Sequence, residues 1–287
     1  MKHFIAIFFI LVFSLPSKAN IPIHYLPTED PGDARLVYIL ELLKLSLSKS
    51  APNETIEFIP LPAVISYARA IHELKRDSYP NYFTPGGVNI ELLGTDNLQA
   101  VDFPLDHGLL SYRICFVSHQ AKRKVTQINS IEELRQFTIA QGTNWPDVSI
   151  LKKNGFKVVE VPLYTSLFKM VVSNRVDLVC RGMNELRSEL KQFKHYGKLT
   201  YDKSFVLIYT MPYKLYFNKS SAELIAKIEL GLAMAKQDGS LDKLFKAYFA
   251  DDLAFAKLSQ RKRFVLTTGY ENSFSDHYKQ YLYNPFQ

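Results

Sequence analysis

The stretch Gly142-Thr143-Asn144-Trp145-Pro146-Asp147 brings ligand-binding side chains together in one short loop. An apolar run at 137–141 precedes it as a predicted strand, and a predicted helix at 147–154 follows it. A loop in this position presents free backbone N–H groups and the positive end of a helix dipole, which suits a carboxylate. Thr143 offers a hydroxyl, Asn144 an amide and Trp145 a flat wall. The pattern also fits an ordinary helix-capping turn with a core tryptophan.

A second polar pair follows the predicted strand at 176–180. Arg181 and Asn184 fall at the carboxyl end of that strand, where open α/β sheets bind their ligands. An arginine there can hold a carboxylate through two parallel hydrogen bonds. An ion pair of Arg181 with Glu185 or Glu189 is the alternative.

Four further residues are weaker candidates for a binding site. Tyr67 and Arg69 stand near the start of a predicted amphipathic helix at 63–76, where an arginine is usually solvated. Arg113 stands in a predicted strand at 112–118, and Thr84 follows two aromatic residues that can form walls.

Strands and helices alternate along most of the chain. Predicted strands occupy 55–59, 112–118, 137–141, 157–161, 176–180, 204–210 and 213–218, and helices of about ten residues separate those of the middle block. One helix is predicted to begin at Asp33, and a capping box at Ser130 opens another. Residues 77–110 are predicted to be rich in loops, and the tail from Arg261 lacks periodicity. This alternation predicts an α/β fold with parallel pairing.

The first 19 residues have the layout of a secretory signal peptide. Lys2 and His3 precede an apolar run at 4–15, and small residues lead to a cleavage site after Ala19. The apolar run is shorter than the roughly 20 residues that span a bilayer. We therefore expect a periplasmic protein, and one without a lipid anchor because no cysteine follows the cleavage site.

Charge and cysteine content narrow the function further. Without the signal peptide, basic residues exceed acidic ones by five, and the runs at 122–124 and 261–263 are interpreted as solvated surface. We expect no nucleic-acid partner. An oxidising compartment permits a disulfide between Cys115 and Cys180, but two separate buried thiols are the favoured interpretation.

Catalytic and metal-binding motifs do not stand out. The chain has no Gly-x-Ser-x-Gly or His-Glu-x-x-His pattern, and its histidines are dispersed. His107 and Ser111 lack an evident acid partner and are interpreted as surface polarity. We expect no enzymatic activity, no metal and no cofactor.

The order of several short motifs resembles the bacterial extracellular solute-binding proteins of family 3, the amino-acid-binding type. The matching stretches are Leu61-Pro62-Ala63-Val64-Ile65-Ser66-Tyr67-Ala68-Arg69-Ala70, Phe103-Pro104-Leu105, Ser130-Ile131-Glu132-Glu133-Leu134, Gly142-Thr143, Asn174-Arg175-Val176-Asp177, and Gly231-Leu232 with Gln237-Asp238-Gly239-Ser240. The resemblance spans most of the chain. The chain is similar in particular to an orphan branch of that family. The stretches that carry this similarity are Gly108-Leu109-Leu110-Ser111-Tyr112-Arg113, the 142–147 loop, Arg181-Gly182-Met183-Asn184-Glu185 and Tyr281-Leu282-Tyr283-Asn284-Pro285.

The resemblance implies the type II periplasmic binding protein fold, in which two α/β lobes joined by two crossing hinge strands close on a ligand. Lobe one would comprise residues 20–118 plus 205–287, and lobe two residues 119–204. The hinge strands would lie at 112–118 and near 201–206. The resemblance also places the 142–147 loop at the cleft, which favours a binding role for it.

One departure from the family bears on the ligand. The family usually carries a Thr-x-x-Arg motif in lobe one, and the corresponding residues here, from Thr84 to Leu93, contain no arginine. Arg113 or Arg181 would have to replace it. We expect a monomer that captures a small polar, carboxylate-bearing solute for an ABC-type inner-membrane permease, or alternatively reports it to a membrane sensor.

Overall fold

The computed structural model describes residues 20–28, 34–87, 96–269, 271 and 274–286. The predicted signal peptide and the predicted helix cap at Asp33 lie outside these residues. Within these ranges, no helix is both long enough and apolar enough to cross a membrane.

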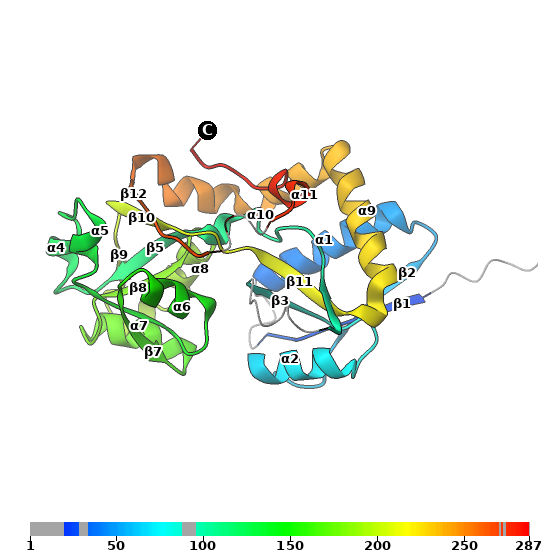
Figure 1. Cartoon of the computed structure of the whole chain (residues 1–287), viewed down its shortest axis with the longest axis horizontal. Helices are drawn as coiled ribbons and strands as arrows, with labels where there is room; N and C mark the ends of the chain where they lie inside the picture. Colours follow the sequence, from blue (N-terminus) through cyan, green and yellow to red (C-terminus); the bar gives the residue numbers. More distant parts are fainter. Residues whose placement is uncertain (1–19, 29–33, 88–95, 270, 272–273, 287) are drawn as a thin grey trace, which may run out of the picture.

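Two sheets form two bodies that lie side by side (Figure 1). The first sheet has the order β2-β1-β3-β11-β4, with β1 parallel to β2 and β3, and with β11 antiparallel to β3 and β4. Its strands are β1 (Asn20–Tyr25), β2 (Thr55–Pro60), β3 (Phe83–Gly87), β4 (Leu98–Ala100) and β11 (Tyr213–Asn218). We call this sheet, with the helices α1 (Ala34–Ser50), α2 (Tyr67–Arg76) and α9 (Ala222–Gln237), the first body.

Helices α1 and α9 cross at very short distance. A Cβ atom at Gly231 of α9 would lie 1.9 Å from the carbonyl oxygen of Ser46 in α1, so only glycine fits there. The close approach buries Leu42, Leu43 and Ile228 in the main hydrophobic core. Burying aliphatic side chains of this size contributes about 1.5–3 kcal/mol each.

The second sheet has the order β12-β10-β5-β8-β6-β7, and β9 pairs with β5. Its strands are β5 (Tyr112–Val117), β6 (Thr138–Gly142), β7 (Lys157–Val161), β8 (Leu178–Gly182), β9 (Thr200–Tyr201), β10 (Phe205–Ile208) and β12 (Lys262–Val265). We call this sheet, with the helices α4 (Lys122–Val125), α5 (Ile131–Leu134), α6 (Pro146–Lys153), α7 (Tyr164–Val172) and α8 (Met183–Gln192), the second body.

The remaining elements lie on the connections. Four 3-10 turns are η1 (Leu109–Ser111), η2 (Lys194–Tyr196), η3 (Lys219–Ser221) and η4 (Leu258–Gln260), and two further helices are α10 (Ser240–Ala256) and α11 (Asp276–Lys279). Residues 101–111 lead from β4 to β5, and residues 209–212 lead from β10 back to β11. The chain therefore passes twice between the bodies in its middle part.

Several strands and helices differ from the sequence prediction. Helix α2 begins at Tyr67 rather than at residue 63, because the Ser66 side chain caps it by accepting a hydrogen bond from the Arg69 N–H. Val64, within the range predicted as this helix, precedes it and is 50% exposed. Strands β3 and β4 lie in the range predicted to be loops. Strands β10 and β12 belong to the second sheet, although residues 205–287 were predicted to be part of lobe one. The boundaries of the lobes stay a prediction.

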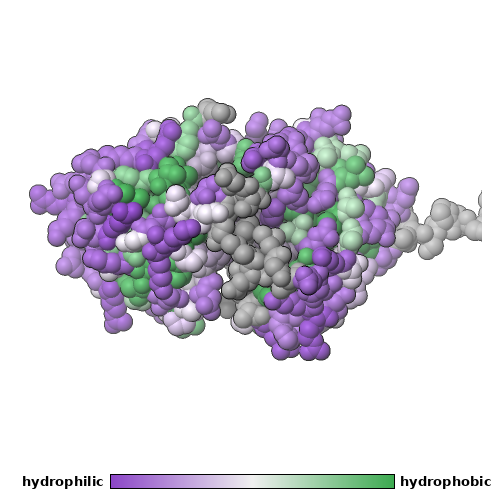
Figure 2. Space-filling view, in the orientation of Figure 1, coloured by the Kyte–Doolittle hydropathy of each residue, from purple (hydrophilic) through white to green (hydrophobic). Residues whose placement is uncertain are grey.

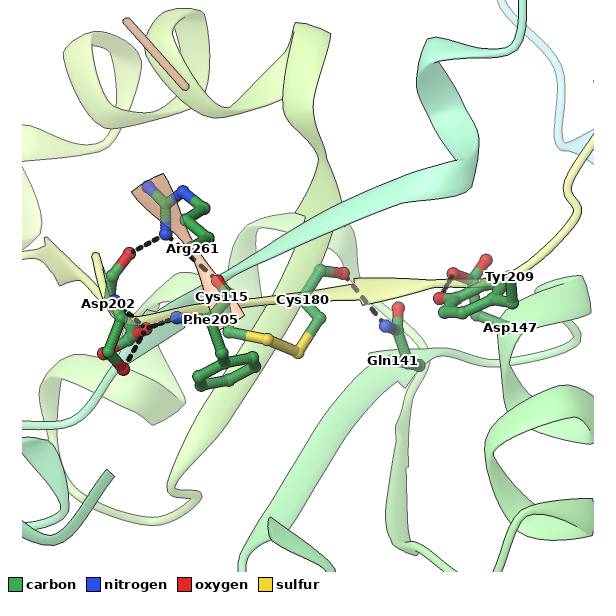
Figure 3. The surroundings of a disulfide bond; sticks show 9 residues. Cys115, Gln141, Asp147, Cys180, Asp202, Phe205, Tyr209 and Arg261 are labelled. Atoms are coloured by element: carbon green, nitrogen blue, oxygen red, sulfur yellow. Dashed lines mark hydrogen bonds between the residues drawn. A yellow bond between two sulfur atoms is a disulfide. The ribbon is translucent and has the colours of Figure 1, made fainter. Parts of the chain in front are cut away.

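A disulfide joins Cys115 and Cys180, so the favoured interpretation of two separate thiols was wrong (Figure 3). The two residues face each other in the antiparallel register of β5 and β8, with their Cα atoms 3.8 Å apart. Both side chains are fully buried. The register depends on a pairing across 65 residues, which local sequence patterns do not specify.

Arg261 corrects the predicted surface position of the basic run at 261–263. Its side chain is 6% exposed, and its guanidinium donates to the carbonyl oxygens of Ala256, Asp202 and Phe205, the last two of which Figure 3 shows. Lys262 and Arg263 are exposed. The buried arginine fixes the start of the C-terminal segment beside β10.

Hydrophilic residues cover most of the face seen in Figure 2. Large exposed apolar side chains include Leu163 before α7, Leu230 and Met234 one turn apart on α9, and Val265 at the end of β12. The described surface therefore shows scattered apolar groups, which are normal for a single chain.

Candidate functional site

The candidate site lies at the carboxyl ends of β6 and β8. These strands are parallel neighbours, so the loop after Gly142 and the turn after Gly182 meet at one edge of the second sheet. A Cβ atom at Gly142 would lie 2.3 Å from the Trp145 ring. A larger residue at this position would displace the indole, which folds back over the glycine.

Trp145 and Arg181, predicted to stand at the same edge, are brought into contact. The guanidinium carbon of Arg181 lies 4.7 Å from the Trp145 ring centre and 5.6 Å from that of Tyr164. A guanidinium close to aromatic rings gains cation–π attraction that is largest when water is excluded. Arg181 is 5% exposed, so this condition holds.

Two carboxylates of α8 bind the Arg181 guanidinium. Its Nη2 donates to Glu185 Oε1 and its Nε donates to Glu189 Oε1 at 2.8 Å. The Tyr164 hydroxyl donates to the same Glu189 oxygen at 2.6 Å. The ion pairs considered as the alternative for Arg181 are therefore present, but they are buried rather than solvated.

Arg113 extends this network toward α6. Its Nη2 lies 3.0 Å from Asp147 Oδ1, and its Nη1 lies 3.7 Å from Glu185 Oε2. The Tyr209 hydroxyl donates to Asp147 Oδ1 at 2.5 Å, and the Arg113 guanidinium lies over the Tyr209 ring. Figure 3 shows Tyr209 and Asp147 side by side at this edge. Arg113 is 2% exposed, and its Nε has no hydrogen-bond partner within the described chain.

The buried acids respond in opposite directions to this environment. Burial alone would raise the pKa of Glu185, but Arg181, Arg35 and Arg113 outweigh it and lower that pKa. Burial dominates at Glu189 and raises its pKa despite the attraction of Arg181. Of these two acids, Glu189 therefore takes up a proton more readily.

The two bodies meet at this network. Arg35, at the start of α1 in the first body, places its Nη1 3.3 Å from Glu185 Oε1 at the start of α8 in the second. Three arginines and three carboxylates thus form one group with a net charge of zero when all are ionised. The network lies where a cleft between the bodies would close.

Four predicted residues lie outside the buried network. Thr143 and Asn144 are exposed on the loop after β6, and Asn144 adopts a positive φ of 64°. Thr84 is buried in β3 and donates to the Tyr82 hydroxyl at 3.1 Å. Arg69 is exposed and pairs with Glu73 on its own helix, as an ordinary surface arginine does.

Tyr67 lies in the first turn of α2, and its side chain is outside the described part of the structure. Asn184, in the first turn of α8, is half-buried, and its Oδ1 has no partner among the described residues. The oxygen atom itself is buried, although the residue as a whole is half-buried.

Sequence reasoning missed Arg35, Tyr164 and Tyr209 as parts of the site. Each comes from an element far along the chain, and only the fold brings it to the edge of the second sheet. The acids were easier to find, because Glu185 and Glu189 follow Arg181 by only four and eight residues in the sequence.

His107 also differs from its prediction. It is 6% exposed, packs against Phe103 and Phe245, and burial lowers its pKa to about 4. In the described ranges, no group of three or more His, Cys, Asp or Glu side chains has the arrangement of a metal site.

The fold is that of the type II periplasmic binding proteins, as the sequence predicted. The extracellular-binding protein ytmK of a probable amino-acid ABC transporter from Bacillus subtilis superposes with a TM-score of 0.61 at 15% identity, over 82% of this chain and 100% of that one. The periplasmic VFT2 domain of Bordetella pertussis BvgS gives 0.58 at 14% identity, over 80% and 93%. An ancestral arginine-binding protein bound to arginine gives 0.54 at 17% identity, over 81% and 99%.

The predicted resemblance to the bacterial extracellular solute-binding proteins of family 3 is confirmed over residues 149–251, which the model of that family matches. These residues run from α6 to α10 and contain Arg181, Glu185 and Glu189. No curated protein matches the chain. The narrower resemblance to an orphan branch stays a prediction.

Proposed function

We propose that this chain is an exported, monomeric solute-binding protein that captures a small polar, amino-acid-like solute between its two bodies and delivers it to an ABC-type permease. The observation that carries the proposal is the ion pair of Arg35 with Glu185, which joins the bodies beside Trp145 and Arg181. The family match supports a binding role and a periplasmic location. The similarity to ytmK supports the transport role.

The solute is proposed to carry a carboxylate. Asn184 Oδ1 and the 143–145 loop offer polar groups for its other end, and Trp145 offers an apolar wall. The arginines already pair with three carboxylates of the chain. The negative charge of a bound solute would therefore have to be balanced by a change in the charge of the network. Protonation of Glu189, whose pKa is raised by burial, would give the network a charge of +1, which the solute's carboxylate would balance.

A thermal-melt screen tests this function. The purified protein is melted with amino acids, small peptides, organic acids, polyamines and sugars. A solute at 100 times its Kd adds about 2.7 kcal/mol to the native state, which raises Tm by several degrees. We expect amino acids or organic acids to respond. A response confined to sugars or polyamines would refute a carboxylate-bearing solute.

A second function is favoured by the charge balance of the network. The chain's own carboxylates neutralise Arg113 and Arg181 within the second body, and Arg35 pairs with Glu185 between the bodies, so the bodies can be held together without a solute. That arrangement suits an adaptor or sensor that presents its surface to a membrane receptor. If no solute of the screen changes Tm although the protein melts cooperatively, this role would be favoured.

A further inference from the structure

We propose that the C-terminal segment, described at residues 261–269, 271 and 274–286, is a strap that ties the two bodies together and limits how far they can separate. In Figure 1 this segment, in red, runs from β12 beside the second sheet to α11 beside α9. The inference goes beyond the proposed function, since it concerns the range of motion and not the solute.

The first half of the strap is fixed to the second body. Strand β12 pairs in parallel with β10, and the Leu266 N–H extends the ladder by donating to Ile208 at 2.8 Å. The Asn154 side chain, at the end of α6, then binds the backbone of Thr267 twice, at 2.8 and 3.2 Å. Lys153 Nζ lies 3.4 Å from the carbonyl oxygen of Thr268. The strap is therefore held to the second body as far as Thr268.

Residues 275–281 are fixed to the first body, whereas Phe286 near the chain end packs against Tyr112 and Arg263 of the second. The Ser275 hydroxyl donates to Asp102 Oδ2 at 2.6 Å, just after β4. Lys214 of β11 donates to the other Asp102 oxygen at 2.8 Å and lies 4.4 Å from the Tyr278 ring centre. Tyr278 and Tyr281 are 1% and 4% exposed, so their rings are part of the core.

The residues after α11 also make close contacts, with the segment at 107–108 and with α9. The Tyr283 N–H donates to the His107 carbonyl oxygen at 2.8 Å. A Cβ atom at Gly108 would lie 2.7 Å from Leu282, so a glycine at that position leaves room for the strap. Lys236 of α9 donates to the Gln280 carbonyl oxygen at 2.7 Å.

The length of chain between the two anchors sets the limit. Seven residue steps lead from Thr268 on the second body to Ser275 on the first, and seven residues span at most about 25 Å. While both anchors stay docked, they cannot separate further than this. The 101–111 and 209–212 segments also join the bodies, as does helix α10, which packs on α8 of the second body and on α1 and α9 of the first; the strap adds one more restraint.

An insertion that lengthens the strap without touching either anchor tests the inference. Twelve Gly/Ser residues between Glu271 and Phe274 would add about 40 Å of reach. The control carries the same insert between Pro52 and Asn53, an exposed turn within the first body. Spin labels at Lys44→Cys on α1 and Glu132→Cys on α5 report the distance between the bodies, since both sites are exposed and both native cysteines are paired.

We expect one narrow distance distribution in the parent and the control, and an added population at longer distance in the strap insert. An unchanged distribution in the strap insert, with a cooperative melt, would overturn the inference. If that insert does not fold, a protease site is placed at the same position instead, and the folded protein is cleaved there. The same added population at longer distance is then expected. The labels need no solute, so this result stands apart from the outcome of the solute screen.

Discussion

Replacing Arg181 by Met removes a guanidinium that pairs with two buried carboxylates. Glu185 and Glu189 are 7% and 3% exposed, so water cannot take its place. Breaking a buried pair by removing one partner costs about 3–5 kcal/mol, because the remaining charge is left uncompensated. We expect R181M to lose about this much free energy of unfolding at neutral pH, measured by urea unfolding followed by circular dichroism.

A matched control uses the same spacing on the surface. Arg69 pairs with Glu73 at i,i+4, as Arg181 does with Glu185, but its side chain is 59% exposed. R69M should therefore lie within about 0.5 kcal/mol of the parent. The double variant R181M/E189Q should recover part of the loss, because it removes one of the stranded charges. Equal losses in R181M and R69M would refute the buried network.

Three further predictions concern the same edge of the sheet. Replacing Cys115 and Cys180 by Ala opens a cross-link over 65 residues, and unfolding free energy should fall by about 4 kcal/mol; a loss below about 1 kcal/mol would contradict a formed disulfide. G142A should displace the Trp145 ring, seen as a change in tryptophan emission, at a cost of about 1–3 kcal/mol; an unaltered spectrum would refute the stacking. Because the pKa of Glu189 is raised, its contribution to stability is present below the unfolded pKa of about 4.3 and is lost as pH rises through the folded value. E189Q should remove that part of the fall in stability above about pH 4, and parallel stability curves of parent and variant would contradict the raised pKa.

Much of the fold was predictable because local patterns specify it. The alternating block from residue 137 to residue 182 has strong periodicity and clear turn residues, and its strands match β6, β7 and β8 within two residues. Strands β3 and β4 were missed because Pro85, Gly86 and Gly87 carry turn chemistry, and pairing with β11 overrides it. The tail from Arg261 has no periodicity, since its order comes from contacts with both bodies.

The candidate site was predictable only at its two loops. Parallel pairing of adjacent strands brings Trp145 and Arg181 together, and the sequence contains that information. The charge balance around them was not predictable, because Arg113, Tyr209 and Arg35 reach the site through antiparallel and interbody contacts. A basic residue at a strand end therefore indicates a site without showing which acids it already binds.

Trp145 emission tests the central claim most directly. It is the one tryptophan of the chain, half-buried, and stacked on Arg181 beside the contact of the two bodies. The solute that raises Tm in the screen is titrated into the purified protein while the emission of Trp145 is recorded. The account predicts a saturable change at the concentration that stabilises the protein. A solute that raises Tm fully while the emission stays constant would contradict binding at this edge.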